Sequence, residues 1–165
     1  MGVSGVGKTT VGRRLAVRLH ATFLEGDDFH PAANVAKMRR GEPLDDADRR
    51  PWLEALAGEL ARRQAAGERV VLACSALRRR YRDLLRGGGA AVRFVYLAGE
   101  PAFVRGRLAG RKGHFMPPSL LDSQFAALEE PGADEAAIRV DAAATPQAIV
   151  DRVVDALGEQ PRSPG

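Results

Sequence analysis

The chain has 165 residues, of which 45% are hydrophobic and 28% charged, and its formal net charge is +4. That length and composition indicate one globular domain with a substantial core. No apolar run approaches the ~20 residues of a membrane span. The only cysteine, Cys74, excludes an intrachain disulfide, so we expect a protein of the reducing cytoplasm.

The residues directly after Met1 carry the most specific motif of the chain. They read Gly2-Val3-Ser4-Gly5-Val6-Gly7-Lys8-Thr9 and fit the P-loop pattern G-x-x-x-x-G-K-[ST]. Backbone N–H groups of such a loop surround the phosphates of a nucleotide, and its glycines allow that close approach. Lys8 would reach the β- and γ-phosphates, and the Thr9 hydroxyl would bind Mg²⁺. The alternative is a glycine-rich turn that matches the pattern by chance.

A P-loop is expected between a strand and a helix, yet Met1 directly precedes Gly2. We therefore expect the place of that strand, near the centre of the sheet, to be unfilled. Its neighbours, including the strand at 70–73, would then expose unpaired N–H and C=O groups. We predict a start site placed too late. The alternatives are another segment that fills the gap, or a chain that folds poorly and is inactive.

The rest of the chain alternates between helical and extended patterns. Apolar residues four positions apart predict a first helix from about residue 8 to 20. In chain order we then expect a strand at 21–24, a helix at 32–40, a helix capped by Asp45 or Asp46 that runs to about 66, a strand at 70–73, a helix at 75–87, a strand at 92–97, helices at 101–108 and 120–128, a strand at 138–140 and a helix at 146–157. This alternation indicates an α/β fold with a doubly wound parallel sheet.

An acidic turn, Glu25-Gly26-Asp27-Asp28, follows the first predicted strand. Ligands of such sheets bind at the carboxyl ends of the strands, so the turn, the P-loop and Ser75 would face one crevice. Phosphoryl transfer needs a group that orients the attacking hydroxyl and takes its proton, and often a second that holds Mg²⁺ through water. The alternative is a solvated turn that caps a helix.

Basic residues gather in two places. Arg107, Arg111, Lys112 and His114 surround a predicted mobile loop, from which arginines could neutralise a transferring phosphoryl group; the alternative is a surface cluster. The run Arg78-Arg79-Arg80-Tyr81-Arg82 raises a competing hypothesis, a nucleic-acid-binding module. Against it, six phenylalanines, two tyrosines and one tryptophan fall mainly in apolar patterns and suggest no stacking platform.

Together these residues resemble the bacterial gluconokinase family, small kinases related to shikimate kinase and the nucleoside monophosphate kinases. The matching stretches span nearly the whole chain in order: GVSGVGKTT, FLEGDDFHP, NVAKMRRGEPLDDADRRPWL, ACSALRRRYRDLLR and RKGHFMPPSLLDSQFAALEEPGADE. The resemblance implies a P-loop kinase fold and transfer of the ATP γ-phosphoryl group, with Mg²⁺, to the 6-hydroxyl of D-gluconate. Shikimate or a nucleotide is the alternative acceptor. We expect one domain over 1–157 with a small lid at about 107–128, a disordered tail at 158–165, and a homodimer.

The resemblance also implies roles for individual positions. It implies that the catalytic residues are Lys8, Asp27 and Arg111. It implies that the residues that bind ATP are Gly2, Val3, Ser4, Gly5, Val6, Gly7, Lys8, Thr9, Thr10 and Arg107. The acceptor pocket is implied to comprise Asp27, His30, Lys37, Arg49, Ser75, Arg82 and His114, and the metal site Thr9 and Glu25. Glu25 stands where relatives usually carry aspartate, giving E-G-D in place of D-G-D.

Overall fold

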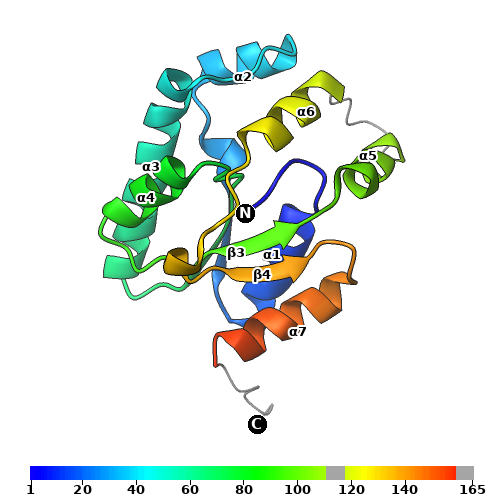
Figure 1. The fold of residues 1–165 in the computed structure, drawn as a ribbon. Helices are drawn as coiled ribbons and strands as arrows, with labels where there is room; N and C mark the ends of the chain where they lie inside the picture. The colour runs from blue at the N-terminus through cyan, green and yellow to red at the C-terminus, as the bar shows by residue number, and fades with distance from the viewer. Residues whose placement is uncertain (111–117, 159–165) are drawn as a thin grey trace.

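The computed structural model describes residues 1–110 and 118–158 (Figure 1). Strands and helices alternate in them, as the sequence predicts. Their order is α1 Lys8–Arg18, β1 Thr22–Glu25, the 3₁₀ turn η1 Gly26–Phe29, α2 Ala32–Arg39, α3 Asp46–Ala65, β2 Val70–Ala73, α4 Arg79–Gly87, β3 Val95–Ala98, α5 Pro101–Ala109, α6 Pro118–Ala127, the 3₁₀ turn η2 Ala133–Glu135, β4 Ile138–Asp141 and α7 Pro146–Ala156.

The strands form two parallel pairs. β1 pairs with β2 in the register Thr22 to Val70, and β3 pairs with β4 in the register Val95 to Ile138. Among the described residues no ladder joins β2 to β3, so two two-stranded sheets stand where one four-stranded sheet could lie. The fold is therefore the predicted parallel α/β arrangement, with a break at the point where the strand before the P-loop is expected.

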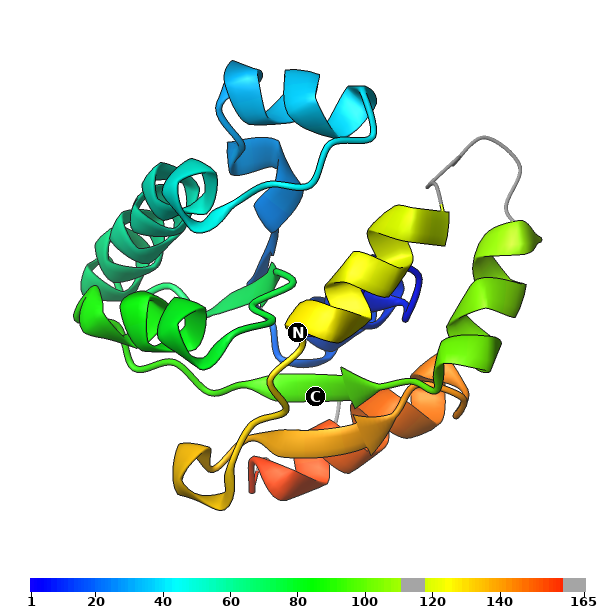
Figure 2. The same ribbon diagram turned by 45° about the horizontal axis from the view of Figure 1, so that its top comes forward.

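Helices cover both faces of these strands. α3 and α4 pack together on one side, where α3 contacts β2, whereas α1 packs against β1, β2 and α7. Figure 1 shows α7 alongside β4, far from α3 and α4, and Figure 2 shows α5 and α6 standing over the P-loop end of the molecule. The apolar core accordingly divides into two clusters. One contains the P-loop valines with α1 and α7, and the other contains Trp52 with α3 and α4.

Most predicted boundaries are confirmed. β2 spans the predicted residues, and Asp45 caps α3 through a capping box with Asp48. The predicted first residues of α4 and β3 were wrong. α4 begins at Arg79 instead of Ser75, because the chain bends at Ala76, whose φ is 44°. β3 begins at Val95 instead of Val92, because its pairing with β4 begins there.

Residues 111–117 of the predicted lid lie outside the described ranges, and so do residues 159–165 of the predicted tail. In the described ranges, no helix combines the length and the apolar character needed to cross a bilayer.

Candidate active site

The P-loop wraps the N-terminus of α1. Gly5 and Gly7 have φ of 87° and 103°, values that favour glycine, and Gly7 is the residue that caps the helix. A Cβ at Gly5 would lie 2.8 Å from Cγ of Leu108, so α5 leaves no room for a side chain. The backbone N–H groups and the positive end of the α1 dipole point to one anion site.

Lys8 lies inside this loop. Its ammonium donates a 3.0 Å hydrogen bond to the carbonyl of Val3. Burial lowers the pKa of Lys8, and the nearby carboxylates of Asp27 and Glu25 act in the opposite direction. An anionic phosphate beside Lys8 would favour the charged ammonium, so the position suits a phosphate-binding lysine.

The next residue joins the loop to the end of β1. The hydroxyl of Thr9 donates a 2.7 Å hydrogen bond to Oε2 of Glu25. Hydroxyl and carboxylate oxygens are the hard ligands that Mg²⁺ prefers, either directly or through its water shell. The expected metal residues are thus adjacent, and their chemistry fits that ion.

The acidic turn η1 is held against the sheet by its glycine. A Cβ at Gly26 would lie 2.6 Å from the carbonyl of Ala73, so only glycine fits. The indole N–H of Trp52 donates a 2.7 Å hydrogen bond to the Gly26 carbonyl. This arrangement fixes the turn while the side chain of Asp27 stays 76% exposed.

His30 lies at the end of the same turn. Its ring stacks on Trp52 with a centroid distance of 4.2 Å, and its side chain is only 4% exposed. Nε2 of His30 lies 4.0 Å from the Asp27 carboxylate. Burial lowers the pKa of His30 below its ordinary value, an effect that Asp27 opposes and Arg49 reinforces. His30 is therefore a neutral imidazole near pH 7, able to donate or accept a hydrogen bond.

Three other expected acceptor residues lie on the elements around this turn. Lys37 on α2 forms a 2.7 Å ion pair with Asp48 at the start of α3. Arg49 donates a 3.3 Å hydrogen bond to the carbonyl of Leu44, and its guanidinium lies over the Tyr81 ring. The carbonyl of Ser75 accepts a 3.1 Å hydrogen bond from the N–H of Gly2, which brings the end of β2 against the P-loop.

Arg82 is fully buried, and this corrects the expectation that it would bind substrate. Its side chain is 0% exposed and forms a two-pronged ion pair with Glu135 at 2.6 and 2.7 Å. Its remaining terminal nitrogen donates to three backbone carbonyls, those of Ala76, Leu77 and Glu129. Arg82 therefore ties α4 to η2 and to the bend after β2.

The other arginines of that run also have acidic partners. Arg78 and Arg80 both pair with Asp46 at the start of α3, and the Tyr81 hydroxyl donates to the same carboxylate. Arg79 pairs with Asp134 at 2.5 Å. The arginines of this run thus form ion pairs within the molecule.

The two helices of the predicted lid, α5 and α6, reach the P-loop from two sides. A Cβ at Gly7 would lie 3.5 Å from the guanidinium of Arg107 on α5. On α6, the side chain of Gln124 accepts a 2.7 Å hydrogen bond from the N–H of Ser4 and donates a 3.2 Å bond to its hydroxyl. The sequence reasoning missed Gln124, since no local pattern distinguishes it. Arg111 and His114 lie outside the described residues.

A P-loop around a partly buried lysine, a Thr–Glu oxygen pair and an exposed aspartate beyond a parallel strand define a nucleotide-dependent phosphotransferase site. The sequence matches the family described as "AAA domain" over residues 1–131. It is 49% identical to a gluconokinase of Gluconobacter oxydans over 154 residues, which cover 93% of this chain and 86% of the relative. The chain belongs to the gluconokinase family.

Solved structures agree with that assignment. A sugar kinase from Janibacter sp. HTCC2649, solved without ligand, superposes with a TM-score of 0.92 at 45% identity and covers 98% of this chain and 93% of its own. A gluconokinase from Sinorhizobium meliloti 1021 superposes with a TM-score of 0.86 at 44% identity, and covers 96% of this chain and 89% of its own. The predicted P-loop kinase fold is confirmed.

Proposed function

We propose that this protein transfers the γ-phosphoryl group of ATP to the 6-hydroxyl of D-gluconate and releases ADP and 6-phospho-D-gluconate. The observation that carries the proposal is the 49% identity to a gluconokinase over 93% of the chain. The contact of Thr9 with Glu25 supports it independently, because it brings the P-loop and the acidic turn together. His30, at the end of that turn, lies 4.0 Å from the Asp27 carboxylate.

The P-loop side of the crevice binds the nucleotide. Backbone N–H groups of residues 2–10 surround the phosphates, and the Lys8 ammonium neutralises the β- and γ-phosphoryl oxygens. The guanidinium of Arg107 lies over Gly7, where it can contact the same phosphates. Arg111, from the undescribed part of the lid, is proposed to stabilise the charge that develops during transfer.

Thr9 and Glu25 would hold Mg²⁺ at the junction of the P-loop and β1. Their oxygens are already 2.7 Å apart, and both are of the type that this ion prefers. The ion would neutralise charge on the phosphoryl oxygens.

Asp27 is proposed as the catalytic base. Its carboxylate takes the proton of the gluconate 6-hydroxyl as that oxygen forms a bond to the γ-phosphorus, and the bond from phosphorus to the β-phosphate oxygen breaks. Glu25 is engaged with Thr9, whereas the carboxylate of Asp27 is exposed. That difference supports the assignment of the base to Asp27 and of the metal to Glu25.

Residues from α2, α3 and the turn after β2 would bind the sugar acid. Arg49 suits the substrate carboxylate, since a guanidinium binds carboxylates through two parallel hydrogen bonds. The neutral imidazole of His30 and the Ser75 hydroxyl suit the row of substrate hydroxyls. Lys37 and His114 complete the proposed pocket, and Arg82 is left out because it is fully buried.

The test is a coupled assay of ADP release with ATP and Mg²⁺ and a panel of acceptors: D-gluconate, other sugar acids, shikimate and nucleoside monophosphates. We expect turnover that depends on D-gluconate. Turnover of shikimate or of a nucleotide, with none of gluconate, would overturn the proposal. A product that carries phosphate at a position other than the 6-hydroxyl, read by ³¹P NMR, would contradict the proposed geometry.

A further inference from the structure

Arg49 differs from other basic side chains near the acidic turn in the way it is bonded. Its Nε donates a 3.3 Å hydrogen bond to the carbonyl of Leu44. Lys37 and Arg82 are both held by carboxylates. By contrast, no described residue forms an ion pair with Arg49 or accepts a hydrogen bond from its terminal nitrogens. Those two nitrogens are therefore available for a ligand of opposite charge.

The charge of Arg49 lies close to the acidic turn. Burial is the main cause of the lowered pKa of His30, and Arg49 lowers that pKa further against the opposing effect of Asp27. Such an effect between two cationic groups falls with the distance between them. Arg49 thus lies near the side chains to which the proposed function assigns the acceptor.

The aromatic ring of Tyr81 supports the guanidinium of Arg49. Cζ of Arg49 lies 5.8 Å from the centroid of that ring, within the range of a cation–π contact. A guanidinium that lies over an aromatic face directs its N–H groups outward in its own plane, where they can form two parallel bonds to a carboxylate. The Leu44 carbonyl takes the Nε–H, and the edge with the two terminal nitrogens stays open.

Tyr81 itself has little freedom to move. It is 7% exposed and packs in the cluster that contains Trp52 and Leu85. Its hydroxyl donates a hydrogen bond to Asp46 at the start of α3. Burial raises the pKa of Tyr81, and the bond to Asp46 raises it further, so the phenol keeps the proton that it donates. The ring is thus held both by the core and by its hydroxyl.

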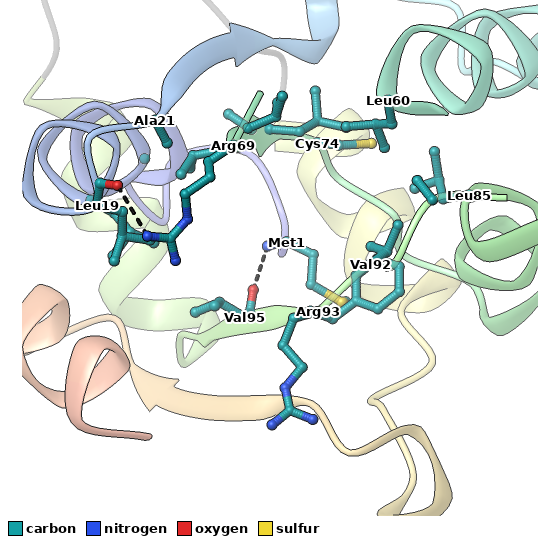
Figure 3. A pocket seen from close by; sticks show the side chains of 18 of the residues that line it. Met1, Leu19, Ala21, Leu60, Arg69, Cys74, Leu85, Val92, Arg93 and Val95 are labelled. Atoms are coloured by element: carbon teal, nitrogen blue, oxygen red, sulfur yellow. Dashed lines mark hydrogen bonds between the residues drawn. The ribbon is translucent and has the colours of Figure 1, made fainter. Parts of the chain in front are cut away.

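The helices that carry Arg49 and Tyr81 are also packed together. α3 contacts α4, and Leu85 lies four residues after Tyr81, on the same face of α4. Figure 3 shows Leu85 of α4 and Leu60 of α3 on the same side of the cavity between β2 and β3. The packing of the two helices therefore sets where the Tyr81 ring lies relative to Arg49.

The carboxylate of Asp46 is occupied by donors other than Arg49. Asp46 lies three residues before Arg49 on α3, a spacing at which an ion pair commonly forms. Instead, Arg78 and Arg80 pair with Asp46, and the Tyr81 hydroxyl donates to it. The bond from Tyr81 is the largest cause of the lowered pKa of Asp46, and the charges of Arg80 and Arg78 act in the same direction. Tyr81 thus helps to keep Asp46 from pairing with Arg49.

We propose that Tyr81 is a positioning residue for Arg49 and thereby makes the enzyme selective for acceptors that carry a carboxylate. This inference rests on the proposed function, in which Arg49 binds the carboxylate of the sugar acid. Tyr81 acts without touching the substrate. Its ring holds the guanidinium in place, and its hydroxyl occupies Asp46, the acid that would otherwise compete for Arg49. An acceptor without a carboxylate gains nothing from this arrangement.

The first test uses the unmodified protein, which contains two tyrosines. In each, an arginine lies over the ring and the hydroxyl donates to a carboxylate: Arg49 lies over Tyr81, and Arg139 over Tyr96. With ¹³C-labelled tyrosine, the ring NMR signals are followed during titration with D-gluconate and with D-glucitol. D-Glucitol is the same carbon chain with a hydroxymethyl group in place of the carboxylate. We expect D-gluconate to shift the Tyr81 signal alone and D-glucitol to shift neither signal. A Tyr81 signal that stays unchanged at saturating D-gluconate, or that D-glucitol shifts equally, would overturn the proposal.

The second test compares Tyr81→Leu with Tyr96→Leu, which removes an equivalent ring outside the proposed acceptor pocket. Tyr81→Leu should raise KM for D-gluconate about tenfold, the effect of losing one hydrogen bond to a charged group. Its kcat and its KM for ATP should change by less than about threefold. Tyr96→Leu should leave KM for D-gluconate near the parent value, and Tyr81→Phe, which keeps the ring, should restore most of the lost affinity. Equal rises in KM for D-gluconate and for ATP, or equal effects of the two leucine variants, would show a purely structural role and overturn the proposal.

The outcomes for the parent separate this inference from the proposed function. A parent that neither phosphorylates nor binds D-gluconate overturns both. A parent that phosphorylates D-gluconate while the Tyr81 signal stays unchanged overturns the inference alone. If Tyr81→Leu does not fold, Tyr81→Met replaces it, and if neither folds, the titration of the unmodified protein decides.

Discussion

The hydroxyl of Thr9 and the carboxylate of Glu25 meet at 2.7 Å, and this contact connects the phosphate-binding loop to the end of β1. Thr9 is the second residue of α1, directly after Lys8, and Glu25 is the last residue of its strand. The glutamate side chain is long enough to bring a carboxylate oxygen within hydrogen-bond distance of the threonine that P-loops use for Mg²⁺.

The first prediction concerns this pair. Glu25→Gln should raise the Mg²⁺ concentration needed for half-maximal activity by about tenfold or more, because residues that orient a metal's ligands contribute on that scale. Glu25→Asp is the matched control and should stay near the parent value, since it keeps the charge. The measurement is initial rate against free Mg²⁺ at saturating ATP. An unchanged Mg²⁺ requirement in Glu25→Gln would remove Glu25 from the metal site.

The second prediction separates the two aspartates of the acidic turn. Asp27→Asn should lower kcat by about 10²- to 10⁴-fold, the usual contribution of a general base. Tm should change little, because the Asp27 side chain is 76% exposed. Asp28→Asn, the neighbouring exposed carboxylate, should keep kcat near the parent value. A kcat for Asp27→Asn close to the parent's would rule out the assigned base.

The third prediction concerns the contact between α6 and the P-loop. Gln124→Leu removes both hydrogen bonds to Ser4 and should raise KM for ATP by about fivefold, the worth of one net hydrogen bond. KM for gluconate should change less. The control is Gln147→Leu, which removes an exposed contact to Asp151 on α7. Equal effects of the two variants on KM for ATP would mean that Gln124 has no special role.

The fourth prediction follows from the buried pair Arg82–Glu135. Hydrogen bonds from Arg82, followed by those from the Gly132 N–H and from Arg86, lower the pKa of Glu135 from its ordinary 4.5 to about 2. The pair therefore stabilises the fold fully above about pH 4.5, and this contribution is lost as pH falls toward 2. The free energy of unfolding of the parent should drop across that window, and Glu135→Gln should show a smaller drop.

The same pair distinguishes a structural arginine from a substrate ligand. Arg82→Met leaves Glu135 buried without its partner and should cost about 3–5 kcal/mol of stability. At a temperature where the variant is folded, its KM for gluconate should equal that of the parent. Arg49→Met is the contrasting variant and should raise that KM. A raised KM in Arg82→Met, with stability intact, would restore Arg82 to the acceptor pocket.

Local patterns were enough to predict much of the fold. The capping box of Asp45 and the apolar run of β2 depend only on neighbouring residues, and both are confirmed. The first residue of α4 could not be predicted from local patterns. The chain bends at Ala76, where the carbonyl of Ser75 accepts from Gly2 and the next two carbonyls accept from Arg82. Those partners come from elsewhere in the fold, so the helical periodicity alone placed the start too early.

In the candidate site, too, local motifs could be predicted from the sequence, whereas contacts between distant residues could not. The P-loop and the acidic turn are contiguous motifs whose spacing carries their chemistry, so the sequence alone is enough to propose Lys8, Thr9 and Asp27 as site residues. Arg82 and Gln124 were misread or missed because their partners are distant in sequence. Glu135 lies 53 positions from Arg82, and Ser4 lies 120 positions from Gln124. Such pairings depend on tertiary structure, which a single sequence does not display.

The division of the core into two clusters has a consequence for how the substrates meet. The nucleotide is assigned to a loop packed on one cluster, and the acceptor to a turn packed on the other. The distance between donor phosphorus and acceptor oxygen therefore depends on how firmly the two clusters are held together. The N–H of Gly2 bonded to the carbonyl of Ser75 is one link between them. Contacts of this kind therefore set the distance across which the proposed phosphoryl transfer takes place.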